Sequence, residues 1–322
     1  MSQQFTESDR AVLAQLLALE LSKKEIAARL NKHRSSIYRE LNRNSGPLGY
    51  LASEAQQRAN ARRRLPRRQA KLSDPRVREY VCQRLEQCWS PDQIAGRSRR
   101  EFPRDRQRQL SRQTIYDWIA LRREQWRPFL RLGCGRRKRR ENGRLPGGVS
   151  IDGRPRIVNL RRRCGDWEGD TIVSRGRRGG LVSLVERKSG FTLLAGVDDL
   201  RAPTVRQAAQ QCLTQLPRHL QRTMTFDNGK EFAEHELLAA ATGMKIYFAR
   251  PYCSWQRGTN ENTNGLVRQY LPKGTDLTAY SHHEVAAIQS SLNDRPRKRL
   301  GYLTPREVLT QNAARHGVAF GD

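Results

Sequence analysis

Three acidic residues in the second half of the chain could carry metal-dependent chemistry. Asp170 lies inside an apolar, β-rich run, Asp227 ends a short strand pattern, and Glu261 opens a helical pattern. An acid inside an apolar strand is unfavourable unless it has partners. Carboxylate oxygens suit Mg²⁺, and two such ions held by converging carboxylates can catalyse phosphoryl transfer. Acids on two neighbouring strands and at one helix start could meet at one edge of a sheet.

Two of these acids have simpler interpretations when each is taken alone. Asp227-Asn228-Gly229 is typical of a hairpin turn, although a helical pattern follows it where a hairpin would need a partner strand. Glu261 could be a solvated acid in the first turn of a helix, where the helix dipole favours negative charge. The residue types leave both interpretations open.

Three further polar residues are candidates to support the acids. Asn228 could orient the neighbouring Asp227 through a hydrogen bond. Asn264 and Arg268 follow Glu261 by three and seven residues, so these three side chains share one face of a helix. That face could guide a phosphate chain, or it could be a salt-bridged surface.

The first half of the chain contains two copies of a helix-turn-helix pattern. Ser22–Glu25 and Ser90–Gln93 are capping boxes, and each starts a helix that a second amphipathic helix follows. The second copy has ten extra residues in its turn. A recognition helix reads base edges with polar residues near its N-terminus. The candidates are Arg34, Ser35, Ser36 and Arg39 in the first copy and Ser111, Arg112, Gln113 and Thr114 in the second. The alternative is two ordinary helical hairpins with charged surfaces.

The charge of the chain indicates a polyanionic partner. Its 322 residues include 61 Lys and Arg against 32 Asp and Glu, a net charge of +29, and 35 of the basic residues lie in 1–150. Nucleic acid is the obvious partner for such an excess. No apolar run is long enough to span a membrane, and the first residues do not resemble a signal peptide. The six cysteines form no C-x-x-C pair and have no zinc-finger spacing. We therefore expect a cytoplasmic protein with reduced thiols that binds double-stranded DNA, without a membrane partner or a small-molecule substrate.

Basic stretches divide the chain into domains. We expect a first helix-turn-helix domain at 1–57, a basic linker at 58–72, a second helix-turn-helix domain at 73–130, and a flexible basic linker at 131–150. After this point three β-rich runs are followed by alternating helices and strands, in the order βββ-α-β-α-β-α with a further helix. Residues 151–322 are therefore expected to form an α/β domain with C-terminal helices.

Several segments together resemble the DDE transposases of bacterial insertion sequences, specifically the insertion-sequence-thirty family. In the α/β domain they are Trp167–Asp170, Thr225–Phe232, Tyr247–Tyr252 and Arg257–Tyr270. The helix-turn-helix residues Glu25–Leu41 and Thr114–Tyr116 and the C-terminal Leu300–Glu307 are similar to the same family, so the resemblance spans nearly the whole chain. Asp166 departs from it, because many members have histidine at this position.

The resemblance implies all-α helix-turn-helix domains followed by a ribonuclease-H-like catalytic core with a mixed five-stranded sheet. It places Asp170, Asp227 and Glu261 at the catalytic and metal-binding positions, with two Mg²⁺ ions as cofactors and Mn²⁺ as the alternative. It also implies that the protein binds the terminal inverted repeats of an insertion sequence, cleaves DNA at the element ends and joins the 3′-OH to target DNA. Such an enzyme would work on the bacterial nucleoid, as a homodimer or a higher homo-oligomer, because two ends must be paired.

Two functions of other classes remain as alternatives. A DNA-binding regulator with an inactive second domain would explain the helix-turn-helix units, but it would be expected to have lost at least one of the three acids. A metal-dependent DNA nuclease would share the acids but would have little use for two sequence-reading units.

Overall fold

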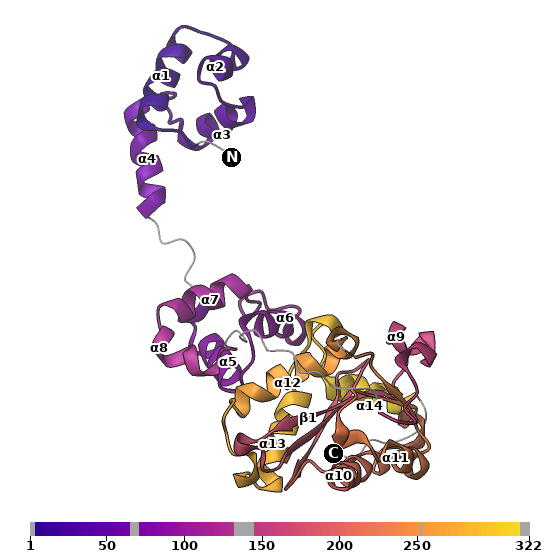
Figure 1. Ribbon diagram of the computed structural model, residues 1–322. Coiled ribbons are helices and arrows are strands. Elements are labelled where there is room, and N and C mark those ends of the chain that lie inside the picture. Colours follow the sequence, from indigo (N-terminus) through magenta and orange to yellow (C-terminus); the bar gives the residue numbers. More distant parts are fainter. Residues whose placement is uncertain (1–3, 65–70, 132–144, 252, 316–322) are drawn as a thin grey trace. The chain divides into compact units, whose positions relative to one another are not determined.

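The protein divides into two compact units, which are described separately. The computed structural model describes residues 4–64, 71–131, 145–251 and 253–315, and the units are Met1–Ala70 and Lys71–Asp322 (Figure 1). Within the described ranges, no helix has both the length and the apolar character that a membrane span requires.

The smaller unit is a bundle of four helices. They are α1 (Glu7–Ala18), α2 (Lys23–Arg29), α3 (Arg34–Asn44) and α4 (Ala52–Arg64). The predicted capping box at the start of α2 is confirmed, because the Ser22 hydroxyl accepts the Glu25 N–H and the Glu25 carboxylate accepts the Ser22 N–H. Leu13, Ile26 and Ile37 pack in its core. Helices α2 and α3 form the first helix-turn-helix, with α3 in the recognition position.

Residues 58–64, which we expected in a basic linker, are part of α4 instead. The Arg58 guanidinium donates to the carbonyl oxygens of Asn44 and Ser45 at 3.0 and 2.6 Å, and Arg62 donates to the carbonyl oxygen of Arg43 at 3.2 Å. The last carbonyls of a helix have no partner within the helix. The arginines that suggested a linker therefore tie α4 to the end of α3. Residues 65–70 lie outside the described ranges.

A buried ion pair holds α1 against α3. Arg10 Nε donates to Glu40 Oε1 at 2.7 Å, and these side chains are only 5% and 9% exposed. We expect Glu40→Ala to destabilise the smaller unit by about 3–5 kcal/mol, because it leaves the Arg10 charge buried without a counter-charge. Hydrogen exchange of α1–α4 in the full chain measures this loss. Glu54→Ala breaks the exposed pair with Arg58 and should cost less than about 1 kcal/mol. Equal losses in the two variants would contradict the prediction.

The larger unit begins with a second helical bundle. Its helices are α5 (Pro75–Glu86), α6 (Pro91–Glu101), α7 (Arg112–Ala120) and α8 (Arg123–Trp126). The predicted capping box at Ser90 and Gln93 is confirmed at the start of α6. Val81, Ile94 and Ile115 lie in its core. Helices α6 and α7 form the second helix-turn-helix, separated by the long turn.

Five strands form one mixed sheet. They are β1 (Asp166–Val173), β2 (Gly180–Glu186), β3 (Thr192–Val197), β4 (Thr223–Phe226) and β5 (Lys245–Phe248). The order across the sheet is β3-β2-β1-β4-β5. Strand β2 is antiparallel to both of its neighbours, β1 and β3, whereas β4 runs parallel to both β1 and β5. The expected ribonuclease-H-like core with a mixed five-stranded sheet is therefore confirmed.

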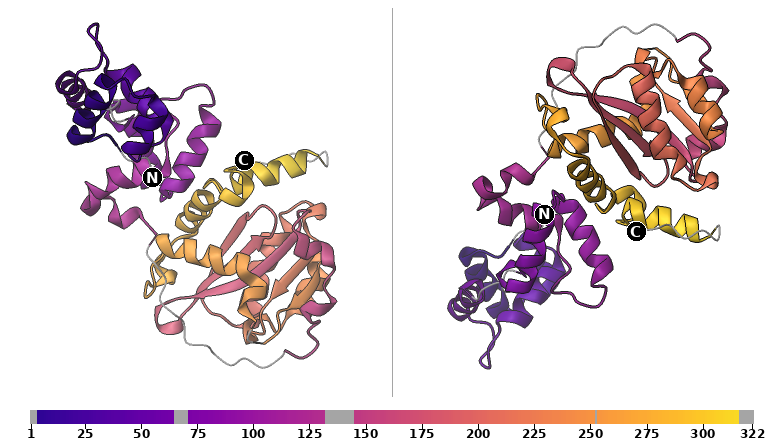
Figure 2. Two further views of the ribbon diagram at one scale, coloured as in Figure 1. Left: turned by 90° about the horizontal axis from the view of Figure 1, so that it is seen from above. Right: turned by 90° about the horizontal axis from the view of Figure 1, so that it is seen from below.

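Helices cover both faces of this sheet (Figure 1, Figure 2). The helices of this part are α9 (Arg156–Leu160), α10 (Ala202–Thr214), α11 (His235–Thr242), α12 (Gly258–Tyr270), α13 (His282–Asn293) and α14 (Pro305–Ala314). Helices α10 and α11 share a core with Trp167 and Phe226, and α12 and α13 share another with Ile172 and Leu181. Side chains alternate along a strand, so Asp170 lies on the same face of β1 as Ile172, the face that α12 covers.

Two segments differ from the expectation. Residues 132–144 of the second predicted linker lie outside the described ranges, but the following residues are attached to the sheet, because the Phe248 N–H donates to the Val149 carbonyl at 2.8 Å. This contact satisfies part of the open edge of β5. Helix α14 was not expected, although Thr304 and Glu307 form a capping box there.

Candidate active site

Asp170 and Asp227 come from neighbouring parallel strands. Strands β1 and β4 pair with Trp167 opposite Met224 and Glu168 opposite Thr225. The same offset places Asp170 level with Asp227, which directly follows β4. The Asp227 carboxylate accepts the Gly229 N–H at 3.0 Å, which closes a tight turn. The chain then enters a helix, and β5 pairs with β4 in parallel, so this turn does not form a hairpin.

Arg257 joins the two aspartates. Its Nη2 donates to Asp227 Oδ2 at 2.8 Å, and its Nη1 lies 3.5 Å from Asp170 Oδ1. Nη1 also donates to the Gly169 carbonyl at 3.1 Å. The Arg257 side chain is 12% exposed, against 22% and 31% for Asp170 and Asp227. Two carboxylates therefore face one guanidinium that is shielded from solvent. Sequence reasoning missed this residue, although it begins the Arg257–Tyr270 motif.

Asp170 is held in an environment that disfavours its charge. Burial raises the pKa of the Asp170 carboxyl above its usual range; Arg257 opposes this shift and the nearby Asp227 carboxylate adds to it. Asn264, on α12, donates from Nδ2 to Asp170 Oδ2 at 2.7 Å. The structure thus brings Asn264, one of the predicted supporting residues, into direct contact with Asp170. A second cation beside the acids would relieve the repulsion between them.

Glu168 anchors the helix that carries the third acid. It lies two residues before Asp170, on the same face of β1, and is fully buried. Glu168 Oε2 accepts the Asn260 N–H in the first turn of α12 at 2.9 Å, while Oε1 pairs with Arg187. An acid at a helix N-terminus satisfies donors that have no partner within the helix. The period-two alternation of the strand could have identified Glu168, which the sequence analysis did not single out.

Glu261 lies on α12 but is not gathered with the aspartates. Its side chain is exposed. Among the described residues, no three His, Cys, Asp or Glu side chains are grouped closely enough to hold a metal ion. Asp170 and Asp227 nevertheless fit a hard cation, because their carboxylate oxygens already converge on one positive group. Glu261 lies four residues after Arg257 and three before Asn264 in the sequence, and those two residues do contact the aspartates.

The remaining two supporting candidates contact backbone groups. Asn228 Nδ2 donates to the Ala249 carbonyl at 2.7 Å and thereby ties the turn after β4 to the end of β5. Arg268 donates from Nη2 to the Val173 carbonyl at 3.2 Å, at the end of β1. Asn228 therefore fixes the backbone next to Asp227 instead of bonding its carboxylate. Arg268 links α12 to the strand that carries Asp170.

Helix α3 presents polar side chains at its N-terminal end. Arg34, Ser35 and Arg39 are exposed and Ser36 is half-buried. Arg39 donates to the Ser35 hydroxyl at 3.0 Å, and Arg34 donates to the Tyr38 hydroxyl at 3.3 Å. Guanidinium and hydroxyl groups of this kind contact phosphates and base edges.

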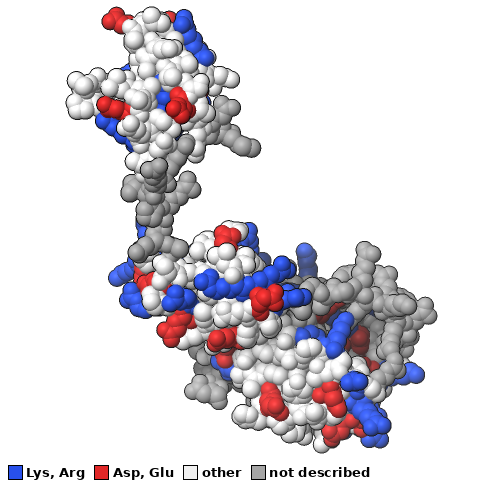
Figure 3. Space-filling view, turned by 90° about the vertical axis from the view of Figure 1, so that its left-hand side faces the viewer, with Lys and Arg blue, Asp and Glu red and all other residues white. Residues whose placement is uncertain are grey.

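Helix α7 repeats the arrangement. Arg112 and Gln113 are exposed, and the half-buried Thr114 donates its N–H to the Ser111 hydroxyl at 3.0 Å. Tyr116 matches Tyr38 in the repeat, and the two tyrosines are 46% and 43% exposed. Each tyrosine belongs to the Ile-Tyr pair that occurs in both copies of the repeat. Figure 3 shows Lys and Arg side chains spread over the larger unit, with Asp and Glu among them.

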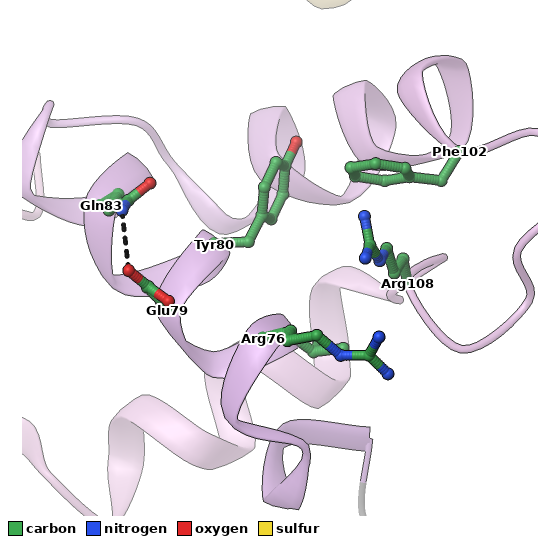
Figure 4. A pocket seen from close by; sticks show the side chains of 7 residues that line it. Arg76, Glu79, Tyr80, Gln83, Phe102 and Arg108 are labelled. Carbon is green, nitrogen blue, oxygen red and sulfur yellow. Dashed lines mark hydrogen bonds between the residues drawn. The ribbon is translucent and has the colours of Figure 1, made fainter.

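The extra residues in the second turn fold back on α5. A cavity of about 300 Å³ lies there, and Figure 4 shows the side chains around it. The rings of Tyr80 and Phe102 meet edge to face with centroids 5.5 Å apart, and the Arg108 guanidinium lies 4.8 Å from the Phe102 ring centroid. Lys71 donates to the Gln109 carbonyl at 2.7 Å. These contacts give the long turn a fixed conformation before α7.

Comparisons with known proteins identify relatives along the whole chain. Residues 2–44 match the family model described as a helix-turn-helix domain. The chain is 38% identical to the transposase for insertion sequence element IS4351 of Bacteroides fragilis, with 99% of each chain covered. It is 37% identical to transposase InsI for insertion sequence element IS30A of Escherichia coli, with 96% of this chain and 84% of that protein covered. The chain belongs to the insertion-sequence-thirty family of transposases.

A further relative covers nearly the whole chain, and one solved structure aligns with part of it. The transposase for insertion sequence element IS1086 of Cupriavidus metallidurans is 40% identical, with 96% of this chain and 95% of that protein covered. A crystal structure of the catalytic core domain of BIV integrase aligns with 47% of this chain and 98% of its own at 20% identity, with a TM-score of 0.37.

Asp166 is the position where this transposase departs from the pattern of many family members. Its carboxylate accepts the Thr223 hydroxyl at 2.8 Å and pairs with Arg163. Asp166 therefore ties β1 to β4.

Proposed function

We propose that this transposase cleaves DNA at the ends of an insertion sequence and joins the freed 3′-OH to target DNA, with Asp170, Asp227 and Glu261 as its catalytic acids. The observation that carries the proposal is the position of Asp170 and Asp227 at one level of two parallel strands, facing a single cationic group. Membership of a transposase family supports it along the whole chain. The enzyme would act on chromosomal DNA in the bacterial cytoplasm.

The three acids would hold two Mg²⁺ ions, with Mn²⁺ as an alternative, since hard cations prefer carboxylate oxygens. When bound, these ions supply an activated water and stabilise the leaving oxygen in an in-line displacement. Asn264 holds the Asp170 carboxylate in place, and the α12 anchor at Glu168 sets the position of Glu261. Hydrolysis of the first phosphodiester leaves a 3′-OH, which attacks a second phosphodiester. No covalent bond between protein and DNA is required.

The two helix-turn-helix units would bind the terminal inverted repeats. Paired ends require a homodimer or a larger homo-oligomer, because one site faces one end at a time. The full chain is the enzyme to test, on linear DNA that carries the repeats flanking its gene, with a target plasmid and Mg²⁺. We expect cleaved ends with a 3′-OH and products joined to the plasmid.

Asp227→Asn should bind the ends and lose both cleavage and joining. Asp199→Asn is the matched control, because Asp199 lies outside the site and pairs with the exposed Arg201; it should behave as the unmodified chain. Cleavage that survives Asp227→Asn would overturn the proposed role of the acids. Specific binding without cleavage by the unmodified chain would favour the regulator, and nicking without joining at any sequence would favour a nuclease.

Gln113 is expected to contribute to recognition of the ends. It is exposed on α7, and its amide donates to Asp117 at 2.7 Å, so its position is fixed. Gln113→Ala should reduce the preference for end DNA over scrambled DNA by about 1–3 kcal/mol, as for loss of one base contact. Gel-shift titrations at one salt concentration measure the preference. Gln83→Ala, on α5, is the control and should leave the preference unchanged; equal effects would contradict a reading role for Gln113.

A further inference from the structure

The C-terminal segment after α13 is the part of the family resemblance that the catalytic proposal leaves without a role. Within the unit Lys71–Asp322 it lies against α6 of the second helix-turn-helix (Figure 1). We call these contacts the α6 seat. Its residues are Asp92, Gln93, Gly96, Arg97 and Arg100 on α6 and Arg295, Pro296, Gly301, Tyr302 and Glu307 in the C-terminal segment.

A bidentate ion pair joins α6 to α14 within the α6 seat. Arg97 donates from Nη2 and Nη1 to the two carboxylate oxygens of Glu307 at 2.8 and 2.9 Å. Arg97 also donates to the Tyr302 carbonyl at 3.3 Å, and Arg100 donates to the Gly301 carbonyl at 3.1 Å. Paired hydrogen bonds between a guanidinium and a carboxylate fix direction as well as distance. The hydrogen bonds from Arg97 lower the pKa of Glu307 below its usual range.

Gln93 connects α6 to the core through a buried arginine. Its Oε1 caps α6 and also accepts Arg295 Nε at 2.8 Å, while its Nε2 donates to the Pro296 carbonyl at 2.8 Å. Arg295 is 2% exposed and donates to Gln269 on α12 at 2.7 Å. A capping box needs only an acceptor at this position. The amide N–H of Gln93 is therefore not needed for capping and instead holds the C-terminal segment through the Pro296 carbonyl. Arg295 therefore links α6 to the helix that carries Glu261.

Gly96 makes room for an aromatic ring. A Cβ atom at this position would lie 2.2 Å from the Tyr302 ring, and the Tyr302 hydroxyl donates to Asp92 at 3.3 Å. Glycine inside a helix is unfavourable, so its presence in α6 needs a packing reason. The reason is the close approach of the ring to the backbone. The seat thus combines shape, charge and buried hydrogen bonds along one face of α6.

We propose that the α6 seat fixes the second helix-turn-helix on the catalytic core and thereby sets which phosphodiester is cut relative to the sequence that α7 binds. Gln93, Gly96, Arg97 and Tyr302 are positioning residues, since they act through the orientation of α7. The inference rests on the proposed function. A rigid connection is needed because a misplacement of about 1 Å can lower a reaction rate about 10²-fold.

Variants of the full chain test the shape and the charged contact of the α6 seat separately. Gly96→Leu inserts a good helix former where the ring must lie, so it should open the seat without weakening α6. Tyr302→Ala removes the ring, and the double variant should close the seat again. Arg97→Met keeps a long apolar side chain on α6 but removes the paired hydrogen bonds to Glu307. It tests the charged contact of the α6 seat without changing the shape at Gly96.

Hydrogen exchange and mapping of the cleaved bond are the two measurements. In Gly96→Leu we expect faster hydrogen exchange in α6 and in residues 295–303. Binding to end DNA should be unchanged. Cleavage at the native bond should fall by about 10²-fold, and new cuts should appear at neighbouring bonds. Arg97→Met should change the exchange rates and the cleavage in the same direction. The double variant Gly96→Leu with Tyr302→Ala should restore both.

Three results would overturn the inference. They are unchanged exchange in both Gly96→Leu and Arg97→Met, faster exchange with unchanged cleavage position and rate, and failure of the double variant to recover. Failure of the unmodified chain to cleave any end DNA would instead reject the proposed function. The exchange data would still decide whether the seat holds α6 on the core, because that measurement needs neither DNA nor metal.

Discussion

Replacing Glu261 by glutamine is expected to abolish cleavage and joining with little loss of stability in the absence of metal. Glu261 is exposed in the first turn of α12, so loss of its charge should cost at most about 1 kcal/mol. A metal ion bound at a phosphoryl-transfer site contributes several kcal/mol of transition-state stabilisation, and each 1.36 kcal/mol is tenfold in rate. We therefore expect a loss of at least about 10³-fold.

The measurement compares strand transfer, end binding and thermal unfolding in one preparation. Glu7→Gln is the control, because Glu7 is also an exposed acid in the first turn of a helix, α1, and lies in the other unit. It should retain full activity. Strand transfer by Glu261→Gln at a rate close to that of the unmodified chain would show that the third acid lies elsewhere. A large loss of stability in this variant would contradict the exposed position of the side chain.

Removing the Arg257 guanidinium is expected to make the stability of the chain depend on divalent metal. Arg257 lies between Asp170 and Asp227 and is the cation that both carboxylates face. Arg257→Met keeps the apolar stem but leaves two partly buried carboxylates without this partner. The free energy of unfolding is expected to fall by about 1–3 kcal/mol. This is less than for a fully buried ion pair, because the aspartates are partly exposed.

Mg²⁺ or Mn²⁺ should then restore stability to the variant more than it stabilises the unmodified chain. A ligand at about 100 times its Kd stabilises a protein by about 2.7 kcal/mol. In the unmodified chain this stabilisation is smaller, because the metal must first displace Arg257 from the two carboxylates. Thermal unfolding with and without metal measures the difference. Arg250→Met is the control, since Arg250 pairs with Asp152 on the surface. Equal metal responses in the two variants would show that Arg257 and the metal do not share a site.

Local sequence patterns predicted the elements of this transposase well. Capping boxes at Ser22 and Ser90 begin α2 and α6 because both partners of each box lie within four residues of each other. The three β-rich runs and the helices that follow them form the expected sheet and crossovers. The composition of residues 58–64 was misleading, because arginines are common both in exposed linkers and in helices, and the carbonyls that Arg58 and Arg62 bond belong to another element.

The candidate site was predicted only in part. Asp170 and Asp227 could be paired in advance because parallel neighbouring strands place their carboxyl ends together. Glu261 could be assigned to a helix, but its distance from the aspartates depends on how α12 packs. Arg257 could not be assigned to the acids from spacing alone, since its contacts to Asp170 and Asp227 span large separations in sequence.

Short-range patterns in the sequence therefore indicated the two helix-turn-helix units and the order of the strands along the chain, because each depends on residues close together in sequence. The same patterns proposed the three acids, whose catalytic role stays a prediction. Which groups meet depends on tertiary packing. It placed Arg257 between the aspartates, Glu168 under the start of α12, and the ring of Tyr302 on Gly96 of α6. These contacts join distant segments, and their geometry follows from packing against a common sheet, which no local pattern encodes.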